Sequence, residues 1–219
     1  MTSSETLSFS EVEASGLGDW RQLFYALHTR FLTGDFGTGL ALVNAIGALA
    51  EEANHHPDLD LRYPHLNVSL MSHDVFGVTS RDVDLALVIS AAAADLGVRA
   101  DPQATGVVEI ALDTWDSEEI KPFWRAVLDL ADSPASEQEL LDLSGRRPTL
   151  WFQHTSRHDE PRQRFHLDIR VPPEVAEARV AAALEAGGVL VTTEHEPAFT
   201  VLADAQGNKV CVTTGRGRE

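Results

Sequence analysis

The chain has 219 residues, enough for one large domain or for two small ones that each bury a core. Apolar residues make up 43% and charged residues 23%, a balance typical of folded globular proteins that excludes a disordered chain. The formal net charge of −17 argues against a basic surface that binds phosphate groups. We therefore expect neither nucleic acid nor an anionic membrane as a partner.

Cysteine content and apolar runs bear on the compartment. Cys211 is the sole cysteine and cannot form an internal disulfide. The first residues do not combine a basic segment with a long apolar run and a cleavage site. The longest apolar stretch, Leu85 to Ala94, is shorter than the roughly 20 residues that a membrane span needs. We therefore expect a cytoplasmic protein without a membrane anchor.

The N-terminal part predicts a tail, a strand and a helix. Residues 3–18 mix Ser, Thr, Glu and Gly without a period, which indicates a loose tail over residues 1–19, before Trp20. The segment from Leu27 to Leu32 weakly favours a strand. Apolar residues three and four apart then predict a helix from Gly37 to Ala53, which Pro57 prevents from running much further.

A second strand and helix follow. Alternating apolar and polar residues predict a strand over residues 66–70. Thr79 and Asp82 have the spacing of a capping box, so we expect a helix that begins at Ser80 and stops at Gly97. Residues 99–106 contain Pro and Gly and indicate a linker.

Beyond the linker the pattern nearly repeats, because a strand leads into a helix twice. Superimposing the two strands places Glu109 opposite His166. We expect residues 107–219 to form one domain of two modules, and residues 131–148 to be irregular. The expected strands are 107–113, 150–154, 165–171, 189–193, 199–203 and 210–213, and the expected helices are 120–130 and 173–186.

One window concentrates groups suited to acid–base chemistry. Imidazole gives and takes protons near neutral pH. Two adjacent histidines follow the end of a helix and a third follows a strand, so all three can project into one cleft. The window contains His55, His56, Pro57, Tyr63, His73 and Asp82. Their joint spacing is far more specific than any one of them alone.

This pattern resembles the pterin-4a-carbinolamine dehydratase family over about Trp20 to Gly97. The matching residues are Glu51, His55, His56, Pro57, Tyr63, His73 and Asp82, and the segment GVTSRDVDLALVI continues the match. The resemblance implies dehydration of a 4a-hydroxytetrahydropterin to the quinonoid dihydropterin, with neither metal nor organic cofactor. It also implies a homo-oligomer, either a dimer or a tetramer.

The resemblance also implies a role for each matching residue. An acid must protonate the leaving 4a-hydroxyl while a base removes the proton on N5. His55 and His73 are the implied acid–base residues, and Glu51 and Asp82 are implied to orient an imidazole. The implied pterin-binding residues are His56, Pro57 and Tyr63.

Two departures and several alternatives remain. The family usually has Trp where this chain has Leu59 and Asn where it has Pro64. Both positions are expected near the pterin cleft, where they would alter the substrate without removing the catalytic groups. Taken alone, the His-His-Pro sequence suits a solvated turn, Asp82 suits a helix cap, and Tyr63 suits a packing residue. Three histidines are also good ligands for Zn²⁺.

The second half resembles the glyoxalase and extradiol-dioxygenase superfamily. The matching parts are the helix that carries Trp124, LWFQH at 150–154, RFHLDIRV at 164–171 and VLADAQGNKVCV at 201–212. Metal-dependent members place ligands on equivalent strands of both modules, where this chain has Glu109 and His166. The alternative for His166 is a core histidine whose hydrogen bonds are satisfied, which we favour. Cys211 stands at the position of the final carboxylate ligand. A thiol is a soft ligand, and a buried lone cysteine is more often a small hydrophobe.

These patterns predict an α+β protein with two domains. Residues 20–98 are expected to form an antiparallel sheet packed with helices, and residues 107–219 to form paired βαβββ modules. A hydro-lyase that acts on a pterin is the favoured function. The alternatives are a metal-dependent lyase or dioxygenase in the second domain, against which Cys211 counts, and a non-enzymatic binding or dimerisation protein, against which the intact histidines count.

Overall fold

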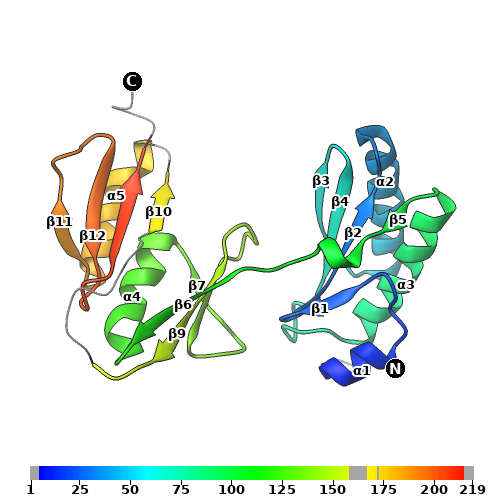
Figure 1. Ribbon diagram of the computed structural model, residues 1–219, viewed down its shortest axis with the longest axis horizontal. Helices are drawn as coiled ribbons and strands as arrows, with labels where there is room; N and C mark the ends of the chain where they lie inside the picture. Colours follow the sequence, from blue (N-terminus) through cyan, green and yellow to red (C-terminus); the bar gives the residue numbers. More distant parts are fainter. Residues whose placement is uncertain (1–4, 158–166, 172, 215–219) are drawn as a thin grey trace. The chain divides into compact units, whose positions relative to one another are not determined.

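The computed structural model describes residues 5–157, 167–171 and 173–214. The chain divides into two compact units, residues 1–107 and 108–219, and each has a hydrophobic core of its own (Figure 1). Within the described ranges, no helix is both long enough and apolar enough to cross a membrane.

The N-terminal unit is an antiparallel sheet with two long helices packed on one face (Figure 1). Its strands follow the order β1-β2-β4-β3, and β5 also pairs with β2. This architecture confirms the α+β prediction for the first half of the chain. The elements are α1 (Phe9–Ala14), β1 (Arg21–Leu23), β2 (Ala26–Leu32), α2 (Phe36–Ala53), β3 (Asp58–Arg62), β4 (His65–Leu70), α3 (Ser80–Asp95), β5 (Arg99–Ala100) and the 3₁₀ helix η1 (Pro102–Ala104).

The core of this unit follows from the two periodicities in the sequence. Every second residue of β2 and β4 is buried, as expected for strands with one face on a core. Helices α2 and α3 present residues at spacings of three and four to the same core. Each fully buried Leu, Ile or Phe contributes about 1.5 to 3 kcal/mol. The largest of these side chains are Leu27, Phe31, Leu42, Ile46, Leu66, Leu70, Leu85 and Ile89.

Residues 7–18 are not the loose tail that we expected. Ser8 caps the N-terminus of α1 and forms a capping box with Glu11. Val12 and Leu17 are buried in the N-terminal core, and the backbone N–H of Leu7 donates to the carbonyl oxygen of Val78 at 2.7 Å. The prediction was wrong because a few buried apolar side chains suffice to dock a segment whose overall composition is polar.

The predicted linker and the hairpin before β4 also contain regular structure that we did not predict. Arg99–Ala100 pairs with β2 as β5, and Pro102–Ala104 forms η1. Strand β3 (Asp58–Arg62) lies at the edge of the sheet beside β4. Edge strands are short and rich in charged residues, so their sequences carry a weak strand signal.

Thr29 is an exception in the apolar core and allows a test of its energetics. Its side chain is buried on β2, and its hydroxyl has no hydrogen-bond partner among the described residues. Because an unpaired buried hydroxyl is costly, we expect Thr29→Val to raise the free energy of unfolding by about 1 kcal/mol. Urea unfolding of the full chain, followed by circular dichroism, measures this change. In the control Thr105→Val, the lost hydroxyl donates to the carbonyl oxygen of Pro102, so stability should not rise. A Thr29→Val protein less stable than wild type would contradict the prediction.

The C-terminal unit contains two modules with the same strand order. The sheets run β6-β9-β8-β7 and β10-β13-β12-β11, and in each the first and last strands of the module pair in parallel. This confirms the predicted paired βαβββ modules. The elements are β6 (Glu109–Thr114), α4 (Ser117–Leu128), β7 (Ala131–Asp132), β8 (Glu139–Leu141), β9 (Thr149–His154), β10 (Leu167–Arg170), α5 (Pro173–Glu185), β11 (Val189–Thr192), β12 (Phe199–Ala203) and β13 (Lys209–Thr213).

One part of this prediction was wrong. Residues 131–148, expected to be irregular, contain β7 and β8, which pair with each other, and β8 also pairs with β9. Both strands are shorter than four residues. Strands this short do not show a period of two, so only their pairing partners reveal them.

Close contacts join the two modules into one unit. The indole N–H of Trp124 on α4 donates to Asp204 Oδ2 at 2.9 Å, and both side chains are buried. At Gly188 a Cβ atom would lie 2.5 Å from the ring of Phe123, so only glycine permits this approach of the second module to α4. The modules therefore share one core.

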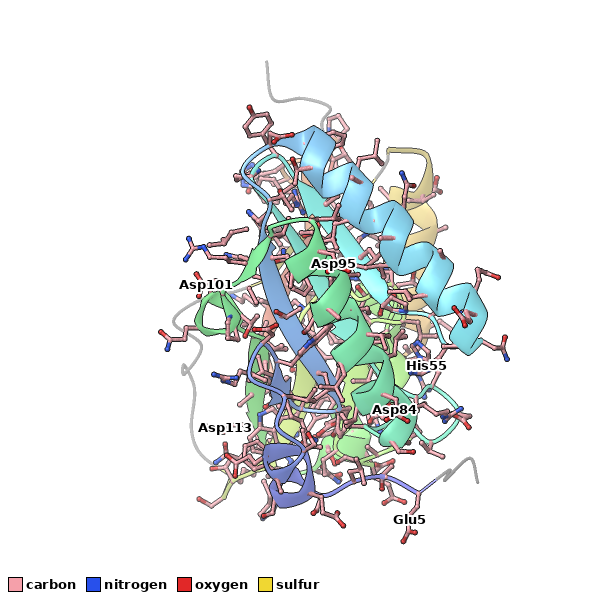
Figure 2. The ribbon with its side chains drawn as sticks, turned by 90° about the vertical axis from the view of Figure 1, so that its right-hand side faces the viewer. Glu5, His55, Asp84, Asp95, Asp101 and Asp113 are labelled. Atoms are coloured by element: carbon pink, nitrogen blue, oxygen red, sulfur yellow. The ribbon has the colours of Figure 1, made fainter. Side chains whose placement is uncertain are left out.

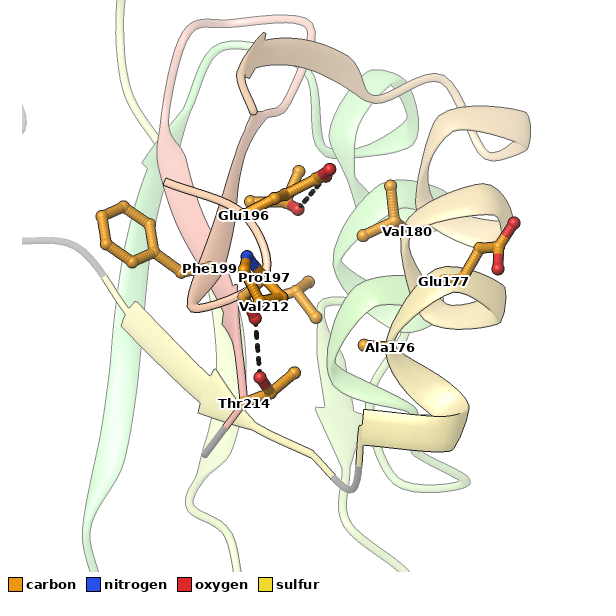
Figure 3. Close-up of a pocket in the computed structure, with 9 residues that line it drawn as sticks. Ala176, Glu177, Val180, Glu196, Pro197, Phe199, Val212 and Thr214 are labelled. Atoms are coloured by element: carbon orange, nitrogen blue, oxygen red, sulfur yellow. Dashed lines mark hydrogen bonds between the residues drawn. The ribbon is translucent and has the colours of Figure 1, made fainter. Parts of the chain in front are cut away.

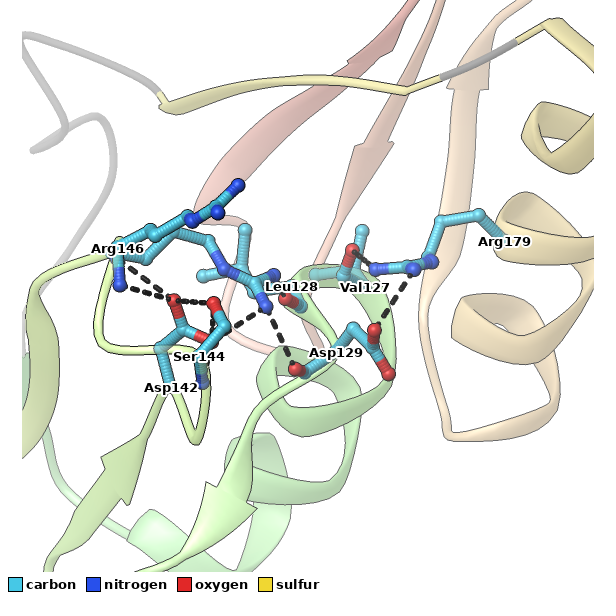
Figure 4. A network of polar contacts seen from close by, with 8 residues as sticks. Val127, Leu128, Asp129, Asp142, Ser144, Arg146 and Arg179 are labelled. Carbon is cyan, nitrogen blue, oxygen red and sulfur yellow. Dashed lines mark hydrogen bonds and ion pairs between the residues drawn. The ribbon is translucent and has the colours of Figure 1, made fainter. Parts of the chain in front are cut away.

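A polar network surrounds the end of α4 (Figure 4). Arg147 donates to the carbonyl oxygens of Leu128 and Asp129, and Arg179 donates to that of Val127. Cations are favourable at a helix C-terminus because they meet the unpaired carbonyls and the negative end of the helix dipole. Asp142 holds Arg147 in place through a 2.9 Å contact with the guanidinium.

Candidate active site

The end of α2 places His55 next to α3. Asn54 adopts a left-handed conformation, and its backbone N–H donates to the carbonyl oxygens of Ala50 and Glu51. The N–H of His55 also donates to the Ala50 carbonyl. Asn tolerates this conformation better than most residues, so the chain can reverse sharply here. His55 is thereby buried between the end of α2 and the start of α3 (Figure 2).

Asp82 is the partner of His55 and is fully buried in the first turn of α3. Its Oδ1 lies 2.7 Å from His55 Nε2. Its Oδ2 accepts hydrogen bonds from the hydroxyl of Ser72 at 2.7 Å and from the backbone N–H of Thr79 at 2.8 Å. A buried carboxylate is tolerated only when its oxygens are paired in this way. The predicted capping box is therefore present, and the same carboxylate also contacts the candidate histidine.

The other two histidines are exposed. His56 Nε2 lies 3.2 Å from Glu51 Oε1, and both side chains are largely in solvent. His73 directly follows Ser72, whose N–H donates to the carbonyl oxygen of Gly77 and closes the loop between them. Because Ser72 contacts Asp82, this loop begins beside the buried pair that Asp82 forms with His55.

Tyr63 is not brought to this group of residues. It lies in the turn between β3 and β4, where Arg62 pairs with His65, whereas Asp58 and Ser69 pair at the end of the hairpin nearer His55. Five strand residues at roughly 3.3 Å each separate the two ends. Pro64 lies in the same turn, far from His55. Within one chain it does not border the expected pterin cleft. Without β3 in the predicted elements, the sequence could not show this separation.

Two further residues, which we expected from the sequence to be near the substrate, lie nearer to His55. Pro57 is half-buried and directly precedes β3, only two residues after His55. Leu59, which replaces the Trp usual in the family, is the second residue of β3 and is 37% exposed. Both lie at the end of the hairpin that contains Asp58.

Two of the three C-terminal candidates, Glu109 and Cys211, lie in the described residues. Glu109 begins β6, and its pKa is raised by burial and by the negative charge of Glu139. His166 lies outside the described residues. In β13, burial and a hydrogen bond to Asp168 raise the pKa of Cys211 to about 11, so the thiol is protonated at neutral pH. Within the described ranges, no three or more His, Cys, Asp or Glu side chains are grouped so that they could hold a metal ion.

A cavity of about 400 Å³ lies between α5 and the strands β12 and β13 (Figure 3). Val180 and Val212 supply apolar walls. Glu196 also lines it and accepts a hydrogen bond from the hydroxyl of Thr200 at 2.9 Å. The sequence predicted no site residue at this place, and none of the acid–base candidates lines the cavity.

Sequence reasoning missed the polar residues that support the site. Ser72 donates to Asp82 and is buried. Arg81 forms an ion pair of 2.5 Å with Asp74, which ties the loop after His73 to α3. The one available signal was position, because Ser72 precedes a candidate histidine and Arg81 precedes Asp82 in the sequence.

Two family models match the chain. The model described as Pterin 4 alpha carbinolamine dehydratase matches residues 5–92, and the model described as Glyoxalase-like domain matches residues 109–213. A protein of Thermosynechococcus vestitus, provisionally named a pterin-4-alpha-carbinolamine dehydratase, is 42% identical over 88 residues, which are 39% of this chain and 93% of the relative.

Solved structures also match each half. A transcriptional coactivator/pterin dehydratase from Brucella melitensis is 28% identical and covers 41% of this chain and 99% of its own, with a TM-score of 0.39. A glyoxalase/bleomycin resistance protein/dioxygenase family enzyme from Burkholderia phytofirmans is 18% identical and covers 48% of this chain and 95% of its own, with a TM-score of 0.40. On the sequence matches, the chain belongs to the pterin-4a-carbinolamine dehydratase family through its N-terminal unit, and a glyoxalase-like domain follows.

Proposed function

We propose that the N-terminal unit dehydrates a 4a-hydroxytetrahydropterin to the quinonoid dihydropterin. The observation that carries this proposal is the 2.7 Å contact between His55 Nε2 and the buried Asp82, in a group that also includes the exposed His56 and His73. A buried carboxylate fixes one imidazole, while exposed imidazoles remain accessible to a substrate. Family membership supplies the substrate class.

The reaction requires two proton transfers. The C4a–O bond breaks as the leaving hydroxyl takes a proton and departs as water. The N5–H bond gives its proton to a base, and its electron pair forms the new double bond between N5 and C4a. Imidazole suits both transfers because it changes charge near neutral pH. We assign these transfers to His55 and His73, with either one as the acid.

The remaining site residues orient the participants. Asp82 positions the ring of His55. Glu51 lies beside His56, and an exposed pair of this kind contributes little to the stability of the fold. The role of Glu51 is therefore to orient the imidazole of His56. His56 and Pro57 then contact the pterin. Tyr63 has no part in the site of a single chain, because it lies at the far end of the β3–β4 hairpin.

Removing the imidazole of His73 tests the proposal. We expect His73→Ala to lower kcat/KM by about 10²- to 10⁴-fold, because one proton transfer loses its group. Stability should change little, since the side chain is exposed. The measurement is a stopped-flow assay of 4a-hydroxytetrahydropterin dehydration, corrected for the uncatalysed reaction.

His65→Ala provides the matched control. His65 is a half-buried histidine of the same unit, at the start of β4 and beside the distant turn, so its loss should leave the rate unchanged. A wild-type protein that does not accelerate dehydration would reject the proposed function. Undiminished activity in His73→Ala would reject the assignment of His73.

A further inference from the structure

We propose that Ser72 is a positioning residue of this site. Its buried hydroxyl holds one oxygen of Asp82, so that the other oxygen remains directed at His55. Its backbone also closes the loop that carries His73. The side chain and the backbone of Ser72 thus position both proposed acid–base residues, His55 and His73. The expected loss of turnover on removing the Ser72 hydroxyl rests on the proposed function. The expected change in the tautomer of His55 does not.

The two oxygens of Asp82 have separate partners. Oδ1 contacts the ring of His55, whereas Oδ2 receives the hydroxyl of Ser72 and the backbone N–H of Thr79. All four residues are buried. Thr79 also brings its hydroxyl to 3.2 Å from Oδ2, so both of its donors approach from the N-terminus of α3. The hydroxyl of Ser72 comes from a different part of the chain, ten residues before Asp82, and at 2.7 Å it makes the shortest of these contacts. Approached from two sides, the carboxylate keeps its plane, and with it the direction of Oδ1.

The direction of each hydrogen bond follows from the donors present. A carboxylate only accepts, so the single hydroxyl proton of Ser72 is given to Asp82. The hydroxyl of Thr79 lies 2.8 Å from that of Ser72 and 3.2 Å from Asp82 Oδ2, and it can donate to either oxygen. On the other side of the carboxylate, the proton must lie on His55 Nε2. The nitrogen left for exchange with substrate is therefore Nδ1 of His55.

The backbone of Ser72 sets the second histidine. Its N–H donates to the carbonyl oxygen of Gly77 at 3.0 Å, and its carbonyl oxygen accepts from the N–H of Val75 at 3.2 Å. These bonds close a short loop whose first residue is His73. Any rotation of Ser72 that breaks its contact with Asp82 would also move the point from which His73 extends.

Three variants test the inference. We expect Ser72→Ala to lower kcat/KM by about 10- to 100-fold, the size of effect seen when a residue that orients an active-site side chain is lost. Ser72→Thr keeps the hydroxyl and should recover most of the rate. Ser69→Ala removes a hydroxyl three residues earlier, on strand β4 and on the face opposite the buried core, and should behave as wild type.

Two readouts separate positioning from a general loss of structure. Because Ser72→Ala removes one donor from the carboxylate that contacts His55, the acidic limb of the kcat/KM profile should move in this variant and stay in place in Ser72→Thr. In parallel, ¹⁵N NMR of the histidine rings should show the Nε2–H form of His55 in wild type and Ser72→Thr, and a mixture of both tautomers in Ser72→Ala.

The outcomes are distinguishable. If wild type shows no dehydratase activity but its His55 tautomer depends on Ser72, the proposed function fails and the positioning role stands. If Ser72→Ala keeps the wild-type tautomer, pH limb and rate, the inference is overturned. It is also overturned if the rate falls only in proportion to the folded fraction, measured by circular dichroism, while the tautomer and the pH limb do not change.

Discussion

Asp82→Asn should lower the dehydratase kcat/KM by about 10²- to 10⁴-fold while leaving the chain folded, because it reverses the tautomer of a proposed catalytic histidine. The amide oxygen of Asn must take the place of Oδ2, where the donors from Ser72 and Thr79 meet. Its NH₂ group then faces His55 and donates to Nε2. The ring proton must move to Nδ1, the nitrogen that the site needs for exchange with substrate.

The measurement combines the stopped-flow assay with ¹⁵N NMR of the histidine rings. Asp84→Asn is the control, since Asp84 is an exposed acid two residues further along α3. We expect it to change neither the rate nor the His55 tautomer. If Asp82→Asn places the proton on Nδ1 and still works at the wild-type rate, then Asp82 does not act by orienting His55.

The second large effect concerns the stability of the C-terminal unit. The side chain of Asp142 is 2% exposed and accepts from the guanidinium of Arg147, from Ser144 and from the backbone N–H of Arg146 (Figure 4). Burial raises the pKa of Asp142, but hydrogen bonds from Arg147 and Ser144 outweigh it and hold the pKa well below its ordinary value. We expect Asp142→Asn to lower the free energy of unfolding by about 2 to 3 kcal/mol at neutral pH.

The pH dependence of this loss follows from the direction of the shift. Because the pKa is lower in the folded chain than in the unfolded chain, deprotonation favours folding. The contribution of Asp142 is complete above its unfolded pKa of about 3.9, and it declines as the pH falls toward the folded value. The stability difference between wild type and Asp142→Asn should therefore shrink between pH 6 and pH 3.

Urea unfolding followed by tryptophan fluorescence measures this difference, since Trp115, Trp124 and Trp151 belong to the C-terminal unit. Asp132→Asn is the control. Its carboxylate also pairs with Lys121 and Arg125, but it is half exposed, so its loss should cost about 1 kcal/mol or less. A difference for Asp142→Asn that is the same at both ends of the pH range would contradict the account.

The elements that could be predicted are those whose own residues carry a period. Helices α2 and α3 repeat apolar residues with a period of about 3.6 residues, and strand β4 with a period of 2. The spacing of Thr79 and Asp82 also predicted the start of α3. The near repeat of the second half predicted two equivalent modules, which have the same strand order. Elements α1, β3, β7 and β8 were missed because each has only two to six residues. Such elements are stabilised by what they pack or pair against, not by their own pattern.

By itself the sequence determined the family, the two-part organisation and which imidazoles and carboxylates are available, because residue types and spacings do not depend on folding. Only the tertiary structure decided which of them meet. His55 and Asp82 are 27 residues apart and bonded, whereas Tyr63, only eight residues from His55, is carried away by a strand. The reason is physical: a spacing along the chain becomes a distance only after the hydrogen bonds of α2, the β3–β4 hairpin and α3 have set the path between two residues.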